Sequence, residues 1–500
     1  MNQSTRWSQF GVLISVFFFW GFVAASNDIL IPVFKEQLHL EQWQAQMISF
    51  AFYVAYTVGS LIYFFVSKAS GGDILNRLGY KNGIAVGLII SALGTLLFYP
   101  AAENASFFLM ITGLFIVGLG FSLQQTAANP LAIVMGDPRG GSQRLSLAGG
   151  INNFGTTIGP LIISFAIFGS ITASSTNVAD IGAVKTPYLM LGAAFLIVAI
   201  IFKFSSVPNK IDLNTSAEET EKEVSKVATP TDVTDAYALP ARKGALNYSQ
   251  LALGMVAIFV YVGVEVSTAA NLPEFMRQHV TVNGAPIPTE RIAPFVSLFW
   301  ASLMIGRWTS SVGAFNVSAT AQSILRFVMP YLAFGVFLLV NKIANHDITP
   351  FYIYALIIVV LIVADLLSRG NPARQLLIFS ALGITALFIG MLADGMVSVY
   401  AFTSVGLFCS TLWPCIFTLA IAGLGKHTNE GASFLVMMIM GGGVISLLQG
   451  YLSGNHLLGI QWSYLVGVGC FLYLAYYAIK AKSVLKAQGI DYDKKVSAAH

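Results

Sequence analysis

Charged residues are scarce in this sequence. Asp, Glu, Lys and Arg account for 10% of the 500 residues, against roughly a quarter in a soluble domain. Apolar residues account for 56%, and the mean hydropathy is +0.73. These values exclude a soluble enzyme and a nucleic-acid-binding protein. They predict an all-α polytopic membrane protein, because lipid requires that backbone polar groups be satisfied within helices.

Cysteine and histidine are also rare. The cysteines lie in apolar runs without metal-ligand spacing, which predicts neither a disulfide framework nor a zinc site: Cys409, Cys415 and Cys470. The histidines fall in predicted loops or in the tail: His39, His279, His346, His427, His456 and His500. We therefore expect no metal and no cofactor. A membrane-embedded transferase is a weaker alternative, because it would carry Asp-rich metal motifs or a histidine flanked by acids within a span.

Long apolar stretches supply the membrane spans, each of about 20 residues. The first follows Arg6, is too long for a signal peptide and lacks a small-residue cleavage site. Six spans are expected in the first part of the chain, at 10–34, 45–67, 82–102, 107–135, 145–169 and 187–206. Eight more are expected in the second part, about fourteen in all, at 249–276, 292–315, 327–344, 349–367, 374–393, 396–424, 432–453 and 462–480.

Residues 207–246 differ from their surroundings. They hold 12 of the 50 charged residues and are predicted to form a flexible cytoplasmic linker. The linker separates an N-terminal six-helix half, 1–206, from a C-terminal half, 247–482, and a cytoplasmic tail follows at 483–500. The second half contains an additional helix pair, inserted at about 320–370. Two such halves are typical of secondary transporters.

The basic residues follow the positive-inside rule. With the N-terminus in the cytoplasm, 22 of the 27 Lys and Arg residues fall on the cytoplasmic side. Both termini are therefore expected there. The inserted pair must cross the membrane twice or not at all, because a single crossing would move Lys426 and the lysines of the tail to the outside.

An acid stands within the first span. Asp28 follows about four turns of apolar residues, and no basic residue lies within four positions of it. A charge in a span costs about 3 kcal/mol or more, and burial disfavours the charged form of a carboxyl group. A carboxyl group in this setting can load and release a proton. The alternative is a structural acid near the outer surface, at an N-cap or in a salt bridge.

Two further charges lie inside predicted spans. Glu265 stands near the middle of its span and is a second candidate for proton coupling. Alternatively it pairs with Arg307 of the next span and only holds the helices together. Arg307 is predicted to be a gating or structural charge. Asp365 and Glu274 stand at span ends, within reach of water.

Uncharged amides cluster in two adjacent spans. Gln125 and Asn129 share a helix face at i and i+4, next to Gln124, and the following span carries Asn152 and Asn153. Amides donate and accept hydrogen bonds, so these groups suit a neutral polyhydroxylated ligand. The alternative is that they join membrane helices to one another.

Tryptophans extend this candidate binding site. The C–H surface of a polyhydroxylated ligand can stack on aromatic faces, which makes candidates of Trp20, Trp308 and Trp413. Asn27, beside the acid of the first span, is a further candidate contact.

Glycines indicate structural positions, where helices approach closely or the chain turns. The stretches 155–160 and 441–443 predict close helix approach. The segment from Gly72 to Lys81 is a tight cationic turn at a cytoplasmic helix boundary, in which Arg77 and Gly79 are predicted to have a gating or structural role. It is a poor phosphate loop, because neither Lys-Ser nor Lys-Thr ends it.

This turn resembles the signature loop of the major facilitator superfamily, G-x-x-x-[DN]-R-x-G-[RY]-[RK]. Other motifs are similar to the fucose-galactose-glucose:proton symporter family within it: Trp20-Gly21-Phe22 leading to Asn27-Asp28-Ile29-Leu30, Thr126-Ala127-Ala128-Asn129-Pro130, Asn152 to Gly155, and Gly431 to Gly443. The resemblance covers most of both halves and spares the linker, the inserted pair and the tail.

The resemblance implies two six-helix halves that rock against each other, with a sugar bound between them and proton movement coupled to it. Asp28 falls on the family's proton-coupling aspartate, and Asn152 on a sugar-contacting asparagine. Fucose permeases carry a glutamate where this chain has Gln125, and polar sugar contacts at the positions of Ala25 and Gly149. The resemblance therefore implies neither a relay of two carboxylates of that kind nor fucose itself.

Together with the resemblance, these residues lead us to expect a secondary active transporter that imports a neutral hexose-type sugar by proton symport. We expect it in a bacterial inner membrane, working as a monomer. A sodium-coupled or facilitative carrier of the same fold is the nearest alternative. A nutrient sensor that does not transport would need a folded signalling domain, for which the linker and the tail are too short and too polar.

Overall fold

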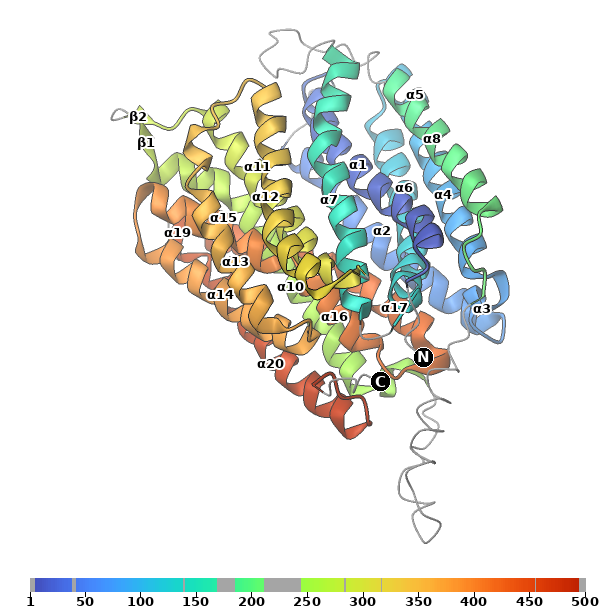
Figure 1. Ribbon diagram of the computed structural model, residues 1–500. Coiled ribbons are helices and arrows are strands. Elements are labelled where there is room, and N and C mark those ends of the chain that lie inside the picture. The colour runs from blue at the N-terminus through green and yellow to red at the C-terminus, as the bar shows by residue number, and fades with distance from the viewer. Residues whose placement is uncertain are drawn as a thin grey trace.

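The computed structural model of the protein describes residues 5–37, 42–137, 140–168, 185–210, 244–282, 285–315, 317–454 and 456–493. Long helices form almost all of this part of the chain, and the earlier helices, blue to green, stand beside the later ones, yellow to red (Figure 1). The prediction of an all-α fold is confirmed. The described residues depart from it only at two short antiparallel strands, β1 (Thr281–Val282) and β2 (Ala285–Pro286).

The predicted N-terminal spans are all helical. The elements are α1 (Trp7–Gln37), α2 (Gln42–Ala69), α3 (Ile74–Leu78), α4 (Tyr80–Leu96), α5 (Phe98–Glu103), α6 (Phe107–Val134), α7 (Gly141–Phe168) and α8 (Lys185–Phe204). The third predicted span is divided between α4 and α5, and α3 lies in the predicted signature loop.

Helices also form the predicted spans of the second part of the chain. The α-helices are α10 (Ser249–His279), α11 (Thr289–Ser311), α12 (Ala319–Ile343), α13 (Tyr354–Ser368), α14 (Pro372–Leu392), α15 (Gly395–Cys409), α16 (Leu412–Ile421), α17 (Thr428–Met437), α18 (Gly441–Leu452), α19 (Gly459–Trp462) and α20 (Leu465–Ala487). Short 3-10 turns join them: η3 (Ala245–Asn247), η4 (Val312–Ala314), η5 (Thr349–Phe351), η6 (Gly425–His427) and η7 (Met438–Met440).

Within the described residues, eleven helical stretches are long and apolar enough to cross a membrane. Both helices of the inserted pair are among them, whereas α1, α7 and α11, at three other predicted spans, are not. The protein is therefore a multi-pass membrane protein. The total of about fourteen crossings stays a prediction.

The described ends of the chain lie at one end of the bundle (Figure 1). The backbone N–H of Arg6 donates to the carbonyl of Met135, just after α6. Gln488, just after α20, exchanges side-chain hydrogen bonds with Gln250 at the start of α10. These contacts hold the first and last described residues against the ends of the helices next to them. That both termini face the cytoplasm stays a prediction.

Glycines allow α1 and α7 to pack closely. A Cβ atom on Gly21 would lie 1.8 Å from the carbonyl oxygen of Asn152, and one on Gly155 would lie 2.4 Å from that of Phe18. Without those side chains, the two backbones approach closely enough to position the amides of α7 beside α1. The predicted role of the glycines at 155 and 441 is confirmed, because a Cβ on Gly441 would lie 2.0 Å from the carbonyl oxygen of Phe259.

A break separates α15 from α16. Proline has no backbone N–H, so Pro414 cannot donate to the carbonyl of Ser410, four residues earlier. Helix α15 ends at Cys409 and α16 begins at Leu412. The break thus leaves a backbone acceptor inside the bundle without its usual helical donor.

The inserted pair, α12 and α13, packs against α11, α14 and α15. The hydroxyls of Tyr354 and Ser302 are 2.7 Å apart, which ties α13 to α11. At the other end of the pair, Arg326 lies 3.9 Å from Asp365, and Gln375 of α14 donates to Asp365 at 3.2 Å. Asp365 is only 6% exposed, so the expectation that it reaches water is wrong. Both partners offset part of the cost of burying Asp365: Arg326 joins the two helices of the pair to each other, and Gln375 fixes the pair to α14.

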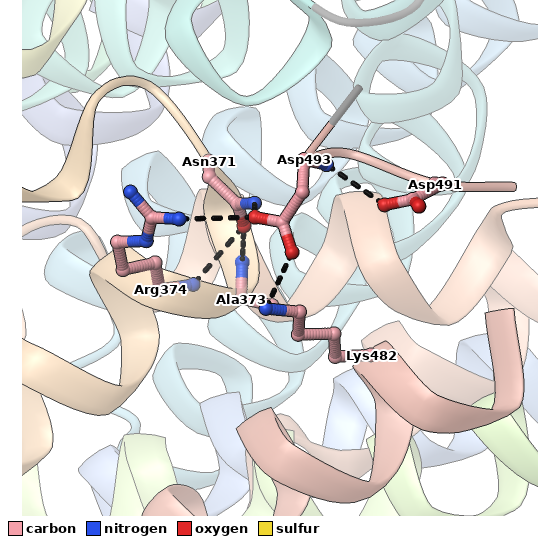
Figure 2. A network of polar contacts seen from close by, with 6 residues as sticks. All are labelled: Asn371, Ala373, Arg374, Lys482, Asp491 and Asp493. Atoms are coloured by element: carbon pink, nitrogen blue, oxygen red, sulfur yellow. Dashed lines mark hydrogen bonds and ion pairs between the residues drawn. The ribbon is translucent and has the colours of Figure 1, made fainter. Parts of the chain in front are cut away.

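The last described residues fold back onto the C-terminal half. Figure 2 shows Asp493 between Lys482 of α20 and Arg374 of α14, with nitrogen–oxygen distances of 2.6 and 3.1 Å. Asn371 also donates to Asp493 at 2.8 Å. The hydrogen bond from Lys482 is the main reason that the pKa of Asp493 lies below its ordinary value.

We expect Gly21→Ala to destabilise the protein, because the colliding atom is backbone and cannot rotate away. Overpacking of this kind costs about 1–3 kcal/mol. Gly11→Ala on the same helix is the matched control, since no atom lies within 4 Å of its Cβ position. Thermal unfolding of the purified protein in detergent compares the two variants. Equal melting temperatures would contradict the close approach of α1 and α7.

The attachment of the tail should depend on pH. Because folding lowers the pKa of Asp493, its contribution is complete above roughly pH 4 and is lost as the pH falls through the lowered pKa. Hydrogen exchange of residues 488–493, corrected for the intrinsic pH dependence, should show protection that fades below that pH. Asp493→Asn should remove the pH-dependent part of the protection. Identical profiles for the two proteins would rule out this attachment.

Candidate functional site

Both polar atoms of the Gln124 amide have partners inside the N-terminal half. Its oxygen accepts from the indole N–H of Trp20 at 2.8 Å, and its nitrogen donates to the hydroxyl of Ser91 at 3.0 Å. The exposed fraction of Gln124 is 0%, and that of Trp20 is 5%. These contacts make Gln124 a residue that holds the Trp20 ring in place. Ser91 was missed from the sequence, since nothing in an apolar span singles out one serine.

The other two amides of α6 differ in exposure. Gln125 is partly exposed and donates to the hydroxyl of Tyr56 at 3.0 Å. Asn129 is 2% exposed, and its side-chain nitrogen has no partner among the described residues. The face predicted from their i and i+4 spacing is therefore accessible at Gln125 and closed at Asn129. Tyr56 was not predicted as its partner.

The two asparagines of α7 point to different neighbours. The side-chain nitrogen of Asn152 donates to the backbone carbonyl of Phe17 on α1, at 3.0 Å. The side-chain oxygen of Asn153 accepts from Arg307 of the C-terminal half, at 2.6 Å. Asn152 thus faces the N-terminal half and Asn153 faces across to the other half.

Arg307 joins the two halves. Besides Asn153, its guanidinium donates to the backbone carbonyl of Gly149 on α7, at 3.3 Å, and to that of Ser410, at 2.9 Å. The Ser410 carbonyl is the acceptor that Pro414 leaves without a helical donor. A Cβ atom at residue 149 would lie only 3.0 Å from the guanidinium, so the glycine at this position makes room for it.

Glu265 reaches Arg307 through a tyrosine. The hydroxyl of Tyr261 donates to the carboxylate of Glu265 and accepts from Arg307 at 3.4 Å. No ion pair within 4.0 Å joins Glu265 to Arg307 directly in the described part of the chain, so the link between them is indirect. Tyr261 was not predicted, although its i, i+4 spacing from Glu265 was a usable signal.

Two of the predicted tryptophans border this link. The ring centroid of Trp413 lies 6.3 Å from that of Tyr261. The Trp308 ring lies 6.3 Å from that of Phe154 on α7. Both tryptophans are partly exposed, so their faces remain available for stacking. Trp20 is more deeply buried and lies against Phe121 and Gln124 of α6.

The predicted gating residues lie at the cytoplasmic end assigned from the sequence. Gly79 ends α3 with φ at +89°, a conformation that side chains rarely adopt, and Arg77 is exposed. The neighbouring Tyr80 donates to Asn429 of α17 at 2.5 Å, and Asn429 donates to Asp73 at 3.3 Å. The signature loop therefore fastens the C-terminal half through Asn429, a residue that the sequence analysis missed.

The remaining expectations concern Asn27, Asp28 and metal ligands. The side chains of Asn27 and Asp28 lie outside the described residues, so their positions stay predictions. Among the described residues, no three His, Cys, Asp or Glu side chains are grouped as metal ligands. The described site can offer amide hydrogen bonds, aromatic faces and one acid linked to one guanidinium. That combination suits an uncharged polar ligand and a proton.

Known proteins are similar to this chain in sequence and in fold. A family model described as Major Facilitator Superfamily matches residues 10–448. A glucose/galactose transporter of Brucella abortus is 32% identical over 93% of this chain and 92% of its own. The L-fucose-proton symporter of Escherichia coli is 26% identical over 89% of this chain and 86% of its own.

A solved structure supports the same assignment at the level of the fold. The crystal structure of FucP, a Major Facilitator Superfamily transporter in the outward conformation, has a TM-score of 0.67 and 24% identity. The superposition covers 94% of this chain and 98% of FucP. With the family match and the close relative, this shows that the chain belongs to the Major Facilitator Superfamily.

Proposed function

We propose that the protein imports a neutral hexose-type sugar by symport with protons. The observation that carries the proposal is the contact between the halves, where the amide of Asn153 meets Arg307 and, through Tyr261, the acid Glu265. Binding of a polar ligand and protonation of a titratable group at this site are energetically coupled, because both change the contact between the same two halves. It is a transporter site and not the active site of an enzyme.

The relatives support the choice of ligand. One is named a glucose/galactose transporter and another an L-fucose-proton symporter. Gln125 and Gly149 differ from the glutamate and the polar contact that the fucose permeases carry, so glucose or galactose is the preferred substrate. The guanidinium of Arg307 already has protein acceptors, which favours an uncharged sugar over a sugar acid.

In this proposal Asp28 is the primary proton-coupling acid and Glu265 the second. Asn152, Gln125 and the rings of Trp308 and Trp413 contact the sugar, while Gln124 holds Trp20. The protein works as a monomer in the lipid bilayer of a bacterial inner membrane, with both termini in the cytoplasm. The six-helix half at 1–206 and the C-terminal half at 247–482, which includes the inserted pair, alternate access to the sugar and are joined by the linker at 207–246.

The coupling ion is tested in proteoliposomes with labelled glucose or galactose. A pH gradient, acidic outside, should drive accumulation, and a sodium gradient should not. Asp28→Asn should abolish accumulation while leaving sugar exchange at equal pH, because the loss of a titratable group removes coupling without removing the sugar contacts. Accumulation by the Asn variant under a pH gradient would refute the coupling role. Accumulation driven by a sodium gradient alone would favour the sodium-coupled alternative. Sugar exchange without accumulation under either gradient would favour the facilitative alternative.

The two glutamines of α6 should respond differently to substitution. Gln124→Leu leaves Trp20 and Ser91 without their buried partner, which should cost about 1–3 kcal/mol of stability. Gln125→Leu removes one partly exposed bond, so it should raise the KM for sugar with a smaller loss of stability. Thermal unfolding and uptake kinetics of both variants check this. The reverse order of stability loss would contradict the positioning role of Gln124.

A further inference from the structure

In the part of the chain that the structure describes, the hydrogen-bonded link from Glu265 toward the N-terminal half runs through Tyr261 and then Arg307. It is a buried residue of α10, 1% exposed, with its hydroxyl between the Glu265 carboxylate and the Arg307 guanidinium. A phenol hydroxyl has one proton to donate. While that proton goes to the carboxylate, the tyrosine oxygen is free to accept from Arg307.

The other acceptors of Arg307 are indifferent to protons. They are the backbone carbonyls of Ser410 and Gly149 and the amide oxygen of Asn153. Tyr261 is therefore the one observed partner of Arg307 whose hydrogen bonding depends on a titratable group. The titratable and charged groups that face Glu265 in the described residues are Tyr261 on its own helix, Arg307 on α11 and the buried thiol of Cys409 on α15.

Protonation of Glu265 changes what Tyr261 can offer. A protonated carboxyl group has a hydrogen of its own to donate, and the tyrosine oxygen is the nearest observed acceptor. Arg307 then competes with Glu265 for that oxygen and no longer faces a carboxylate charge through it. Asn153 is then the remaining side-chain acceptor of Arg307, and it lies across the contact between the halves, as the backbone carbonyl of Gly149 does.

We propose that Tyr261 is a positioning residue that transmits the protonation state of Glu265 to the contact between Arg307 and Asn153, and so to the relative position of the two halves. This proposal rests on the proposed function and adds to it the residue through which the second acid acts. It assigns no sugar contact to Tyr261. The effects of substituting the two residues should therefore be coupled. Substitution of Tyr261 should change sugar accumulation only while Glu265 can ionise.

The first test compares Tyr261→Phe, Glu265→Gln and the double variant in proteoliposomes. Tyr261→Phe should lower sugar accumulation under a pH gradient by about tenfold, the factor that one hydrogen bond to a charged group represents. Exchange at equal pH should change far less. The double variant should be no worse than Glu265→Gln alone. Equal loss of exchange and accumulation, or an additive double variant, would overturn the proposal.

Tyr477→Phe is the matched control for the loss of a buried hydroxyl. Tyr477 is also fully buried in the C-terminal half, and its hydroxyl donates to the backbone carbonyl of Gln250 at the start of α10. The control should keep the accumulation ratio and the pH profile of the unmodified protein. A loss equal to that of Tyr261→Phe would assign the effect to packing and would overturn the proposal.

A second test reads the position of the halves without any sugar. The native cysteines are buried, so Leu78→Cys on α3 and Lys426→Cys on η6, both exposed, can carry spin labels selectively. The distance distribution between the labels should shift with pH, and either Tyr261→Phe or Glu265→Gln should flatten the shift. An unchanged shift in Tyr261→Phe, or no shift in the unmodified protein, would overturn the proposal. A clear shift without sugar accumulation would instead refute the proposed function alone.

Discussion

The structure depends on a guanidinium that must be satisfied inside a membrane bundle. A charge at this depth is costly unless its donors find acceptors, and Arg307 finds them in two backbone carbonyls, one amide and one phenol. Two of these acceptors lie on α7, one on α10 and one in the break after α15, so meeting this requirement brings α7, α10 and the break together around α11. The contact between the halves follows from the same hydrogen bonds.

Two features of the sequence make this arrangement possible. Pro414 withholds the N–H that would otherwise engage the carbonyl of Ser410, and the glycine at 149 leaves the volume that the guanidinium fills. Neither feature is a binding residue, yet both decide where Arg307 lies. The departure from the fucose permeases at residue 149 thus has a steric reason in this chain, since a side chain there would meet Arg307.

Much of the fold could be predicted because a membrane span is a local property of about 20 residues. The helices and the close approach at Gly155 both follow from such local signals. The partners of the site residues could not be predicted, because hydrogen bonds such as that between Arg307 and Asn153 join residues 154 positions apart. Gln124 shows the limit: its residue type suggested a ligand contact, and only its three-dimensional neighbours reveal that Trp20 and Ser91 use its amide. Tyr261 was within reach of local reasoning, since one helical turn separates it from Glu265.

The inserted pair makes the two halves unequal in size. Because Tyr354 and Asp365 fix α12 and α13 to the C-terminal half, that half has the larger cross-section in the plane of the membrane. Viscous resistance from surrounding lipid grows with the perimeter of a moving body. If the halves tilt against each other as proposed, the broader half meets the greater resistance and the N-terminal half turns through the larger angle.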